Sequence, residues 1–307
     1  MKACIDIGGT KVAVSLNNGR DRVLLARRSE PTAKTGNSDA LALQVLRMVD
    51  EACAEQGVAA ASVQSAGVSS CGPFVIRDGL VEVAAPNICG GIAGPERGLP
   101  NDWKTALLEA PLRQRFASLR VENDGIAALE AERRWGALQG LDHCAYVTWS
   151  TGVGVGLCVD GRILRGKNGN AGHAGHMFVS DNDDALCGCG NIGDVEGLVA
   201  GNAIARRFGA DAAKVLERAA AGDAVALAQA DSLCRVLGRM LYNLVATLDL
   251  QRISMGGSVF LHNQALLLPR LQAQVSGRLV ALTDGCEVVA AGLGAEVGDS
   301  AALALLD

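Results

Sequence analysis

Aromatic residues are scarce in this sequence, at 3% of 307 residues, and long apolar runs are missing. No stretch approaches the roughly 18 apolar residues of a membrane-spanning helix. The opening MKACIDIGGT contains no apolar core of a signal peptide. Lysine and arginine never run beyond two in a row, and the net charge is −5, so a nucleic-acid surface is not expected. These absences predict a cytoplasmic protein without membrane or nucleic-acid partners.

What is abundant is glycine and apolar side chains. The chain has 38 glycines, well above the usual share of about 7%, which indicates many tight turns. Hydrophobic residues make up 49% of the sequence and charged residues 20%, enough to bury a full core. The length suits two lobes of about 150 residues. The ten cysteines, without a secretory signal, predict reduced thiols.

Two stretches of the chain resemble each other. Residues 3–19 read ACIDIGGTKVAVSLNNG, and residues 145–161 read AYVTWSTGVGVGLCVDG. Each has an apolar strand pattern, a turn of small residues, a second strand pattern and a closing turn, Asn18-Gly19 or Asp160-Gly161, typical of type I′. A third strand pattern follows each. The sequence predicts a duplicated β-meander; two unrelated glycine hairpins are the alternative.

The first turn of each meander has the chemistry of a phosphate loop. Without a Cβ, glycine lets backbone N–H groups approach phosphate oxygens closely. Thr10 and Thr151 add hydroxyl donors, and Lys11 adds a positive charge. The sequence contains neither a Walker motif nor a dinucleotide-binding G-x-G-x-x-G that opens a helix.

Helical patterns alternate with these strands, which indicates an α/β fold. Helices are expected over residues 38–55 (with a serine N-cap), 124–138, 196–208 and 211–250, the last with breaks near Gly222 and Gly238, and a strand within 252–259.

Seven motifs together resemble the ROK family of bacterial sugar kinases and sugar-responsive repressors. They are DIGGTK (6–11), PNI (86–88), END (122–124), STGVGVG (150–156), GNAGHAGHM (169–177), CGCGNIGDVE (187–196) and MGGSV (255–259). The resemblance extends from residue 2 to about residue 295. It implies a two-lobed actin-like (ribonuclease H-like) ATPase fold with duplicated β-meander phosphate loops. The lobes expected are 1–122 (small) and 123–307 (large), with the final helix returning to the small lobe.

The resemblance also implies roles for individual residues. Asp124 matches the catalytic base, and a carboxylate at a helix N-terminus is favoured in its charged form; an ordinary N-cap is the alternative. The residues implied in sugar binding are Gly72, Asn87, Asn123, Asp124, His173, His176 and Glu196. Those implied in binding ATP are Asp6 (holding Mg²⁺ through water), Gly8, Gly9, Thr10, Lys11, Thr151, Gly152, Gly154, Gly256 and Gly257.

A structural zinc site is implied as well, with one ligand changed. The family uses a histidine and three cysteines, and this chain offers His176, Cys187, Cys189 and Asp194. Zinc accepts an aspartate oxygen, although this harder donor is expected to hold it less tightly. In the family the zinc shapes the loop that carries His176 and Glu196. The alternative is a metal-free loop with two buried thiols.

A second departure concerns sugar specificity. His173 stands where most of the family has glutamate, a replacement shared by N-acetylmannosamine kinases and by a group of glucokinases. An imidazole can donate a hydrogen bond to an acetamido carbonyl, which a carboxylate cannot. Residues 89–101 are longer than the family's usual link, and Cys71 and Cys89 flank the sugar side.

The expected function is an ATP-dependent hexose kinase that phosphorylates the 6-hydroxyl, of glucose in the first place. N-acetylmannosamine or another amino sugar is the alternative substrate. The aliphatic helices within 211–250 suggest a homodimer, as is common in the family. Two other classes stay open: a sugar-responsive repressor, disfavoured because the first strand begins at residue 2, and a sugar sensor without catalysis.

Overall fold

The computed structural model describes residues 1–93, 98–181 and 185–306. The chain forms two compact units. The first comprises residues 1–131, 165–171 and 298–307, and the second comprises 132–164 and 172–297. None of the helices in the described part of the chain is both long and apolar enough to cross a membrane. The lobe boundary expected between residues 122 and 123 stays a prediction.

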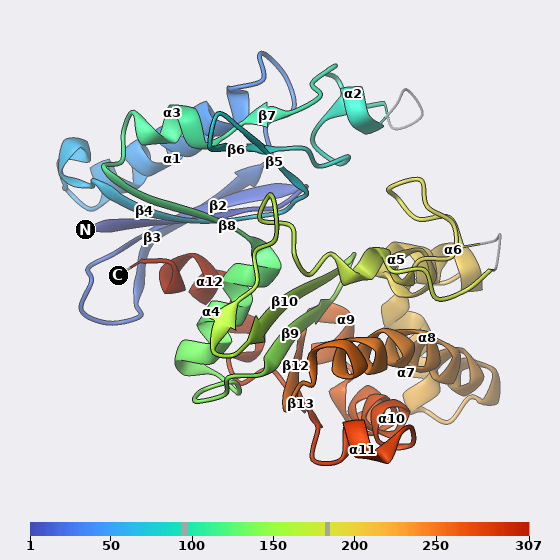
Figure 1. The fold of residues 1–307 in the computed structure, drawn as a ribbon. Helices are drawn as coiled ribbons and strands as arrows, with labels where there is room; N and C mark the ends of the chain where they lie inside the picture. The colour runs from blue at the N-terminus through green and yellow to red at the C-terminus, as the bar shows by residue number, and fades with distance from the viewer. Residues whose placement is uncertain (94–97, 182–184, 307) are drawn as a thin grey trace. The chain divides into compact units, whose positions relative to one another are not determined.

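The first unit is built on a five-stranded sheet in the order β3-β2-β1-β4-β8 (Figure 1). Its strands are β1 (Lys2–Ile7), β2 (Lys11–Asn17), β3 (Leu24–Pro31), β4 (Ser65–Ser70) and β8 (Ser118–Asn123). The first three strands pair antiparallel, and β4 and β8 extend the sheet in parallel with β1. The meander predicted for residues 3–19 and beyond is thereby confirmed.

Helices and a smaller sheet complete this unit. They are α1 (Ala40–Glu55), η1 (Ala60–Ser62), α2 (Gly90–Ala93), α3 (Glu109–Arg113), most of α4 (Asp124–Trp135) and of α12 (Val297–Ala304), and the strands β5 (Phe74–Arg77), β6 (Leu80–Val83) and β7 (Ala106–Leu107). On α1, residues at helical spacing such as Leu41, Val45 and Met48 are fully buried, since this stripe packs toward β2. The expected serine N-cap is wrong: Asp39 precedes the helix, without a side-chain cap.

The second unit repeats the same topology. Its sheet has the order β11-β10-β9-β12-β13, made of β9 (Cys144–Trp149), β10 (Val153–Val159), β11 (Arg162–Ile163), β12 (Arg252–Gly256) and β13 (Glu287–Ala290). Its first three strands are again antiparallel and the last two parallel to β9. The sheets are thus equivalent strand by strand, which confirms the predicted duplication.

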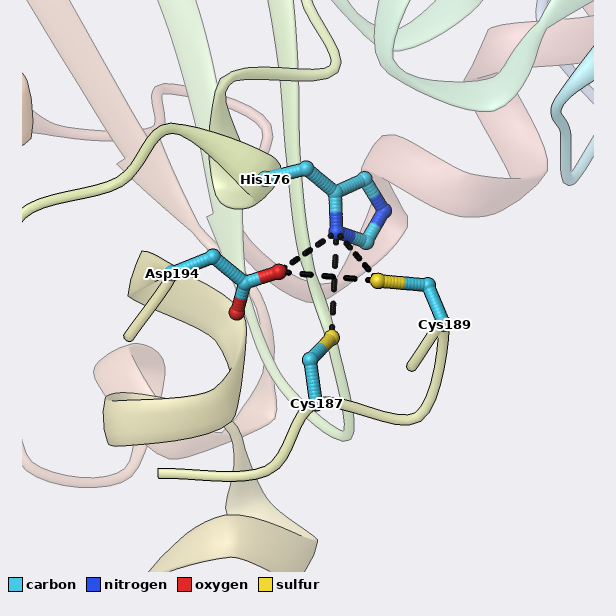
Figure 2. A group of neighbouring side chains, drawn as sticks. All are labelled: His176, Cys187, Cys189 and Asp194. Carbon is cyan, nitrogen blue, oxygen red and sulfur yellow. Dashed lines mark hydrogen bonds and ion pairs between the residues drawn. The ribbon is translucent and has the colours of Figure 1, made fainter. Parts of the chain in front are cut away.

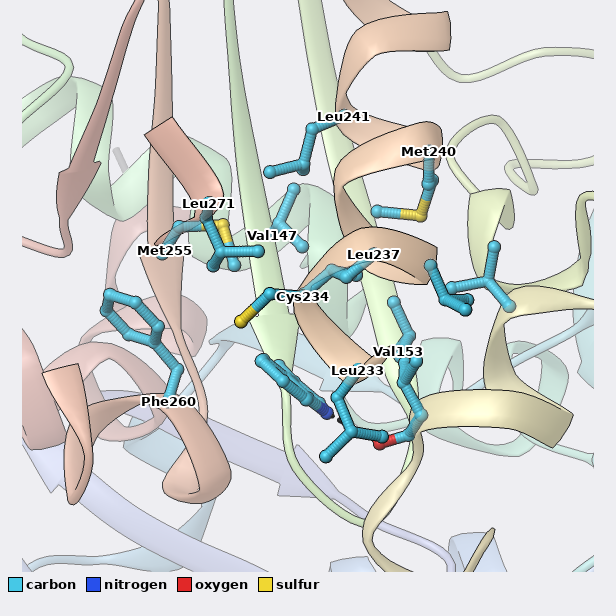
Figure 3. Close-up of a cluster of buried hydrophobic side chains, with 14 of the residues drawn as sticks. Val147, Val153, Leu233, Cys234, Leu237, Met240, Leu241, Met255, Phe260 and Leu271 are labelled. Atoms are coloured by element: carbon cyan, nitrogen blue, oxygen red, sulfur yellow. Dashed lines mark hydrogen bonds between the residues drawn. The ribbon is translucent and has the colours of Figure 1, made fainter. Parts of the chain in front are cut away.

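The helices of the second unit are η3 (Ala174–His176), α5 (Val195–Val199), α6 (Gly201–Phe208), α7 (Ala212–Ala220), α8 (Ala224–Leu248), α9 (Ser258–Leu261), α10 (Gln264–Ser276), α11 (Val280–Thr283) and η4 (Gly294–Glu296). The periodicity correctly predicts helices over the region of α5, α6, α7 and α8, whereas η3, α9, α10, α11 and η4 were not predicted. Figure 3 shows side chains of α8, among them Leu233 and Leu237, packed with Val147 of β9 and Val153 of β10. The break at Gly222 is confirmed by its φ of 88° between α7 and α8.

The break expected at Gly238 is wrong, because α8 continues through it. A Cβ at this glycine would lie 2.3 Å from the Cβ of Gln274 on α10. Gly238 is therefore the place where α10 packs closely on α8, and the packing of the two helices outweighs the low helix propensity of glycine.

The two closing turns of the meanders differ. Asp160 and Gly161 both have positive φ, 52° and 71°, and connect β10 to β11 directly, as predicted. Between β2 and β3 the connection covers residues 18–23, and Asn18 is not among the residues with positive φ. The type I′ prediction at Asn18 is wrong because the side chain of Asn17 takes over the turn, donating to the carbonyls of Asp21 and Val23.

Candidate active site and metal centre

The first phosphate turn, residues 8–10, is closed by hydrogen bonds at both sides. The Gly8 N–H donates to the Lys11 carbonyl at 2.8 Å. Thr32, the residue directly after β3, holds the same turn. Its hydroxyl donates to the Gly8 carbonyl at 2.7 Å, and its N–H donates to the Thr10 carbonyl at 3.0 Å. Thr10 and Lys11 are exposed. Sequence reasoning missed Thr32, because nothing in its local pattern marks a residue that braces a distant turn.

Gly9 lies directly against Asn87, a residue predicted to bind sugar. A Cβ at Gly9 would stand 1.8 Å from Asn87 Nδ2, so a larger residue there would displace the amide from its present position. Asn87 itself is exposed. The structure therefore brings a predicted sugar residue onto the predicted phosphate turn within one unit.

Asp6 and Asp124 are close enough in the first unit to influence each other's charge. Burial, followed by repulsion from the Asp124 carboxylate, raises the pKa of Asp6 to about 6, although Ser69 donates to it at 3.3 Å. A divalent cation would relieve both effects. Asp6 therefore fits the predicted role of holding Mg²⁺.

This electrostatic cost leads to a stability prediction. The pKa of Asp6 is about 6 in the fold against 3.8 ordinarily, so the fold is destabilised above pH 6 and not below pH 4. We expect Asp6→Asn to raise Tm by a few degrees at pH 8 without Mg²⁺ and to have no effect near pH 4. Calorimetry of both proteins at the two pH values measures it, and a lower Tm for the variant at pH 8 would contradict the prediction.

Asn123 and Asp124 lie where β8 ends and α4 begins. Asn123 is buried, and its amide is already engaged: Oδ1 accepts from the Gly125 N–H at 3.1 Å, and Nδ2 donates to the Ser70 carbonyl at 3.5 Å. Asp124 is exposed as the first residue of α4, and its Oδ1 accepts from the Gly125 N–H at 2.8 Å. The start of α4 thus presents a carboxylate to solvent, and Asn123 fixes the backbone beside it.

The second phosphate turn is organised around Glu196 of α5. Its Oε2 accepts from the Val153 N–H at 3.0 Å, and a Cβ at Gly152 would lie 2.7 Å from the same oxygen. The Ser150 N–H donates to the Gly152 carbonyl at 2.9 Å, and Thr151 at the tip is exposed. Glu196 therefore braces this turn, a contact that the sequence reasoning missed; its role as a sugar contact stays a prediction.

The two histidines lie at either end of η3. Their rings are 6.2 Å apart between centroids and 28° from parallel. The glycines that precede each histidine let η3 lie on β10, since Cβ atoms at Gly172 and Gly175 would stand 2.0 and 2.4 Å from the carbonyls of Val155 and Val153. A glycine is therefore required before each of the two histidines, because the backbone of η3 packs closely on β10.

Gly256 and Gly257 are the two glycines predicted to lie against the adenosine of ATP, and each is close to a bulky aromatic residue. A Cβ at Gly256 would lie 2.4 Å from the hydroxyl oxygen of Tyr146, and one at Gly257, whose φ is 87°, would lie 2.4 Å from the Trp149 carbonyl. These contacts require glycine at both positions, whatever the loop binds.

His176, Cys187, Cys189 and Asp194 point toward one another in Figure 2, and their ligand atoms all lie within 4.8 Å of one another. His176 Nδ1 lies 3.1 Å from Asp194 Oδ2, 3.8 Å from Cys187 Sγ and 3.5 Å from Cys189 Sγ. Zinc bonds of about 2.3 Å to sulfur and about 2.0–2.1 Å to nitrogen or oxygen, arranged tetrahedrally, separate neighbouring ligand atoms by roughly 3.3–3.8 Å. The four side chains fit a zinc ion.

Asp194 also begins α5. Its Oδ1 accepts from the Gly197 N–H at 2.7 Å as an N-cap, which leaves Oδ2 for the cluster. Burial works to raise the pKa of Asp194, but hydrogen bonds from His176 and Gly197 bring the pKa below its ordinary value. Burial raises the pKa of the Cys187 thiol, so metal binding would have to displace its proton. At the position where the resemblance implies a third cysteine, Asp194 thus both caps a helix and joins the cluster.

The predicted residues divide between the two units. The first unit holds Asp6, Gly8, Gly9, Thr10, Lys11, Gly72, Asn87, Asn123 and Asp124, and the second holds Thr151, Gly152, Gly154, His173, His176, Cys187, Cys189, Asp194, Glu196, Gly256 and Gly257. The link of residues 89–101 was expected to be long, and four of its residues lie outside the described residues. The same is true of the three residues between Asp181 and Ala185.

Known proteins resemble the chain over nearly its full length. Residues 2–307 match the ROK family. A glucokinase of Aeropyrum pernix is 29% identical over 98% of this chain and 95% of its own. An N-acetylmannosamine kinase of Escherichia fergusonii is 33% identical over 86% of this chain and 85% of its own. A ROK glucokinase from Streptomyces griseus, solved with glucose and AMPPNP, is 27% identical, covers 98% and 97% of the two chains and superposes with a TM-score of 0.73.

The chain belongs to the ROK family, and its fold is the actin-like ATPase fold of the ROK hexokinase structures. The sequence-based identification of both is confirmed.

Proposed function

We propose that this ROK sugar kinase transfers the γ-phosphate of ATP to the 6-hydroxyl of glucose. The observation that carries the proposal is the exposed carboxylate of Asp124 at the start of α4, in the same unit as the braced turn of residues 8–10. The full-length similarity to a glucokinase and to a glucokinase solved with glucose and AMPPNP supports it.

In the proposed reaction, Asp124 accepts the proton of the sugar hydroxyl as its oxygen bonds to the γ-phosphorus. The bond from that phosphorus to the β–γ bridging oxygen breaks, and ADP leaves. The backbone N–H groups of the turn of residues 8–10 stabilise the phosphates, with Thr10 and Lys11 as further donors, and the turn around Thr151 offers donors of the same kind. Asp6 would hold Mg²⁺, which supplies charge neutralisation on the phosphates when bound.

An N-acetylated amino sugar is the second candidate substrate, and His173 favours it. The imidazole N–H can donate to an acetamido carbonyl, and the 33% identical relative is an N-acetylmannosamine kinase. His173 lies at the start of η3, half-buried and 6.2 Å from the ring of His176. A cytoplasmic location, zinc occupancy and a homodimer through the helices of residues 211–250 are further parts of the proposal.

The test is coupled ADP release with ATP and Mg²⁺ against glucose, mannose, fructose, glucosamine, N-acetylglucosamine and N-acetylmannosamine. We expect kcat/KM, the measure of specificity, to be highest for glucose. A preference for N-acetylmannosamine would replace the substrate and keep the kinase. Sugar binding without ADP release for any of the sugars would favour the sensor, and tight DNA binding at physiological salt would favour the repressor.

A further inference from the structure

Asn170 makes with Phe74 the pair of hydrogen bonds that a neighbouring β-strand would make. The Phe74 N–H donates to Asn170 Oδ1, and Asn170 Nδ2 donates to the Phe74 carbonyl, both at 2.7 Å. Phe74 begins β5, the edge strand of the sheet β5-β6-β7. An edge strand leaves such backbone groups without a partner strand. The amide of Asn170 supplies both missing partners from a residue 96 positions away.

The segment that carries Asn170, residues 165–171, is a closed loop, here named the clamp loop. It is closed by the Ala171 N–H, which donates to the Arg165 carbonyl at 3.0 Å. Arg165 Nε donates to Glu122 on β8 at 2.7 Å, and this carboxylate is nearly fully buried. The clamp loop therefore has two attachments in the first unit, one on β8 and one on β5.

Both attachments adjoin residues expected to bind sugar. Glu122 immediately precedes Asn123 and Asp124. Phe74 follows the turn that contains Gly72, and its side chain is 2% exposed in the core of the first unit. The other end of that turn is fixed by the Cys71 N–H, which donates to the Ile7 carbonyl on β1 at 2.8 Å. At the far end of the Gly72 turn, the Ala84 N–H donates to the Pro73 carbonyl at 2.8 Å from the side of β6, and Asn170 holds Phe74 from the open edge of β5.

We propose that Asn170 is a positioning residue for sugar binding, which holds the Gly72 turn in place through the backbone of Phe74. The proposal rests on the proposed function, because it takes the sugar as the ligand of this turn. The phosphate turn of residues 8–10 has its own brace in Thr32. Loss of the clamp is therefore expected to weaken binding of sugar and to leave binding of ATP unchanged.

Three variants test the clamp. Asn170→Asp keeps the size and the acceptor but sets a carboxylate oxygen against the Phe74 carbonyl, so two acceptors face each other. Asn170→Ala removes both hydrogen bonds without that repulsion. Asn168→Asp makes the same chemical change two residues away, at a side chain for which the described structure shows no hydrogen bond, and is the matched control.

We expect the KM for sugar to rise about tenfold in Asn170→Asp, since small misplacements of binding groups have large effects. The rise in Asn170→Ala should be smaller. The KM for ATP, kcat and Tm should stay close to wild type in both, and Asn168→Asp should match wild type throughout. The measurements are steady-state kinetics with glucose and N-acetylmannosamine, and calorimetric titration of each sugar.

Comparing the rise in KM for sugar between Asn170→Asp and Asn170→Ala distinguishes a role for the two hydrogen bonds from a role for the volume of the side chain. If shape alone mattered, alanine would be the worse substitution, and that order would overturn the proposal. Equal rises in the KM for sugar and the KM for ATP would also overturn the proposal. So would a KM for sugar in Asn170→Asp that equals the wild-type value. If wild-type protein binds and phosphorylates sugar and the Asn170→Asp variant has the same KM for sugar, the role of Asn170 is refuted and the proposed function stands. A wild-type protein that binds none of the sugars refutes the proposed function together with the clamp.

Discussion

Replacing Asp124 by asparagine is expected to lower kcat about 10²–10⁴-fold, because general-base catalysis contributes on this order. The amide keeps the size of the side chain and can still accept from the Gly125 N–H, the bond that Asp124 makes at 2.8 Å. It cannot accept a proton from a sugar hydroxyl. Sugar affinity should therefore persist while turnover falls, as measured by ADP release and by calorimetric titration with sugar.

Asp39→Asn is a matched control for this variant. Asp39 precedes α1 much as Asp124 begins α4, lies in the same unit and makes no side-chain cap. We expect it to retain wild-type kcat and KM. Turnover in Asp124→Asn within a few-fold of wild type would remove Asp124 from the role of base and leave it an N-terminal residue of the helix.

Loss of zinc is expected to give the second large effect. Purified protein should contain about one zinc per chain, and removing it with a chelator should lower Tm markedly. A ligand at a thousand times its Kd stabilises a fold by about 4 kcal/mol. Cys187→Ser should show the same loss without chelator. The measurements are elemental analysis and thermal unfolding, with zinc restored as the check of reversibility.

Asp194→Asn distinguishes the two tasks of Asp194. Its amide oxygen can still accept from the Gly197 N–H, so α5 keeps its cap, but the anionic ligand is gone. We expect weaker zinc binding and, in the metal-free state at neutral pH, a Tm slightly below that of metal-free wild type, because the charge that lowers the pKa of Asp194 through its bond to His176 is lost. Folded, active protein with no metal and no response of Tm to chelator would show that the loop works without zinc.

The sequence was informative where structure repeats at short range. The two meanders, the helix that begins at Asp124 and the break at Gly222 follow from alternation, capping and glycine. One exception was decided by a distant partner, since Gly238 stays helical where α10 packs against it. Another was local: the side chain of Asn17 rather than the backbone of Asn18 organises the turn after β2. No local pattern reports on a contact made far along the chain.

The same limit applies to the site. The motifs located the cluster around His176, and the structure brings its four side chains together. The brace by Thr32, the bond from Val153 to Glu196 and the clamp by Asn170 were not predicted. Each joins a side chain to the backbone of a separate element, so the residue type alone carried no signal. Glu132 is a further example: its buried carboxylate accepts from Ser254 Oγ and from backbone N–H groups that include those of residues 292 and 293.

The contact between Gly9 and Asn87 has a thermodynamic consequence for the proposed kinase. An amide that touches both a sugar and the phosphate turn makes the two occupancies depend on each other. Any shift of Asn87 on binding sugar changes the space above Gly9, and any tightening of the turn around ATP restricts Asn87. Linkage then requires that the factor by which sugar changes the affinity for ATP equal the factor by which ATP changes the affinity for sugar. We therefore expect the binding of each substrate to change the affinity for the other, with one coupling free energy measurable from either side.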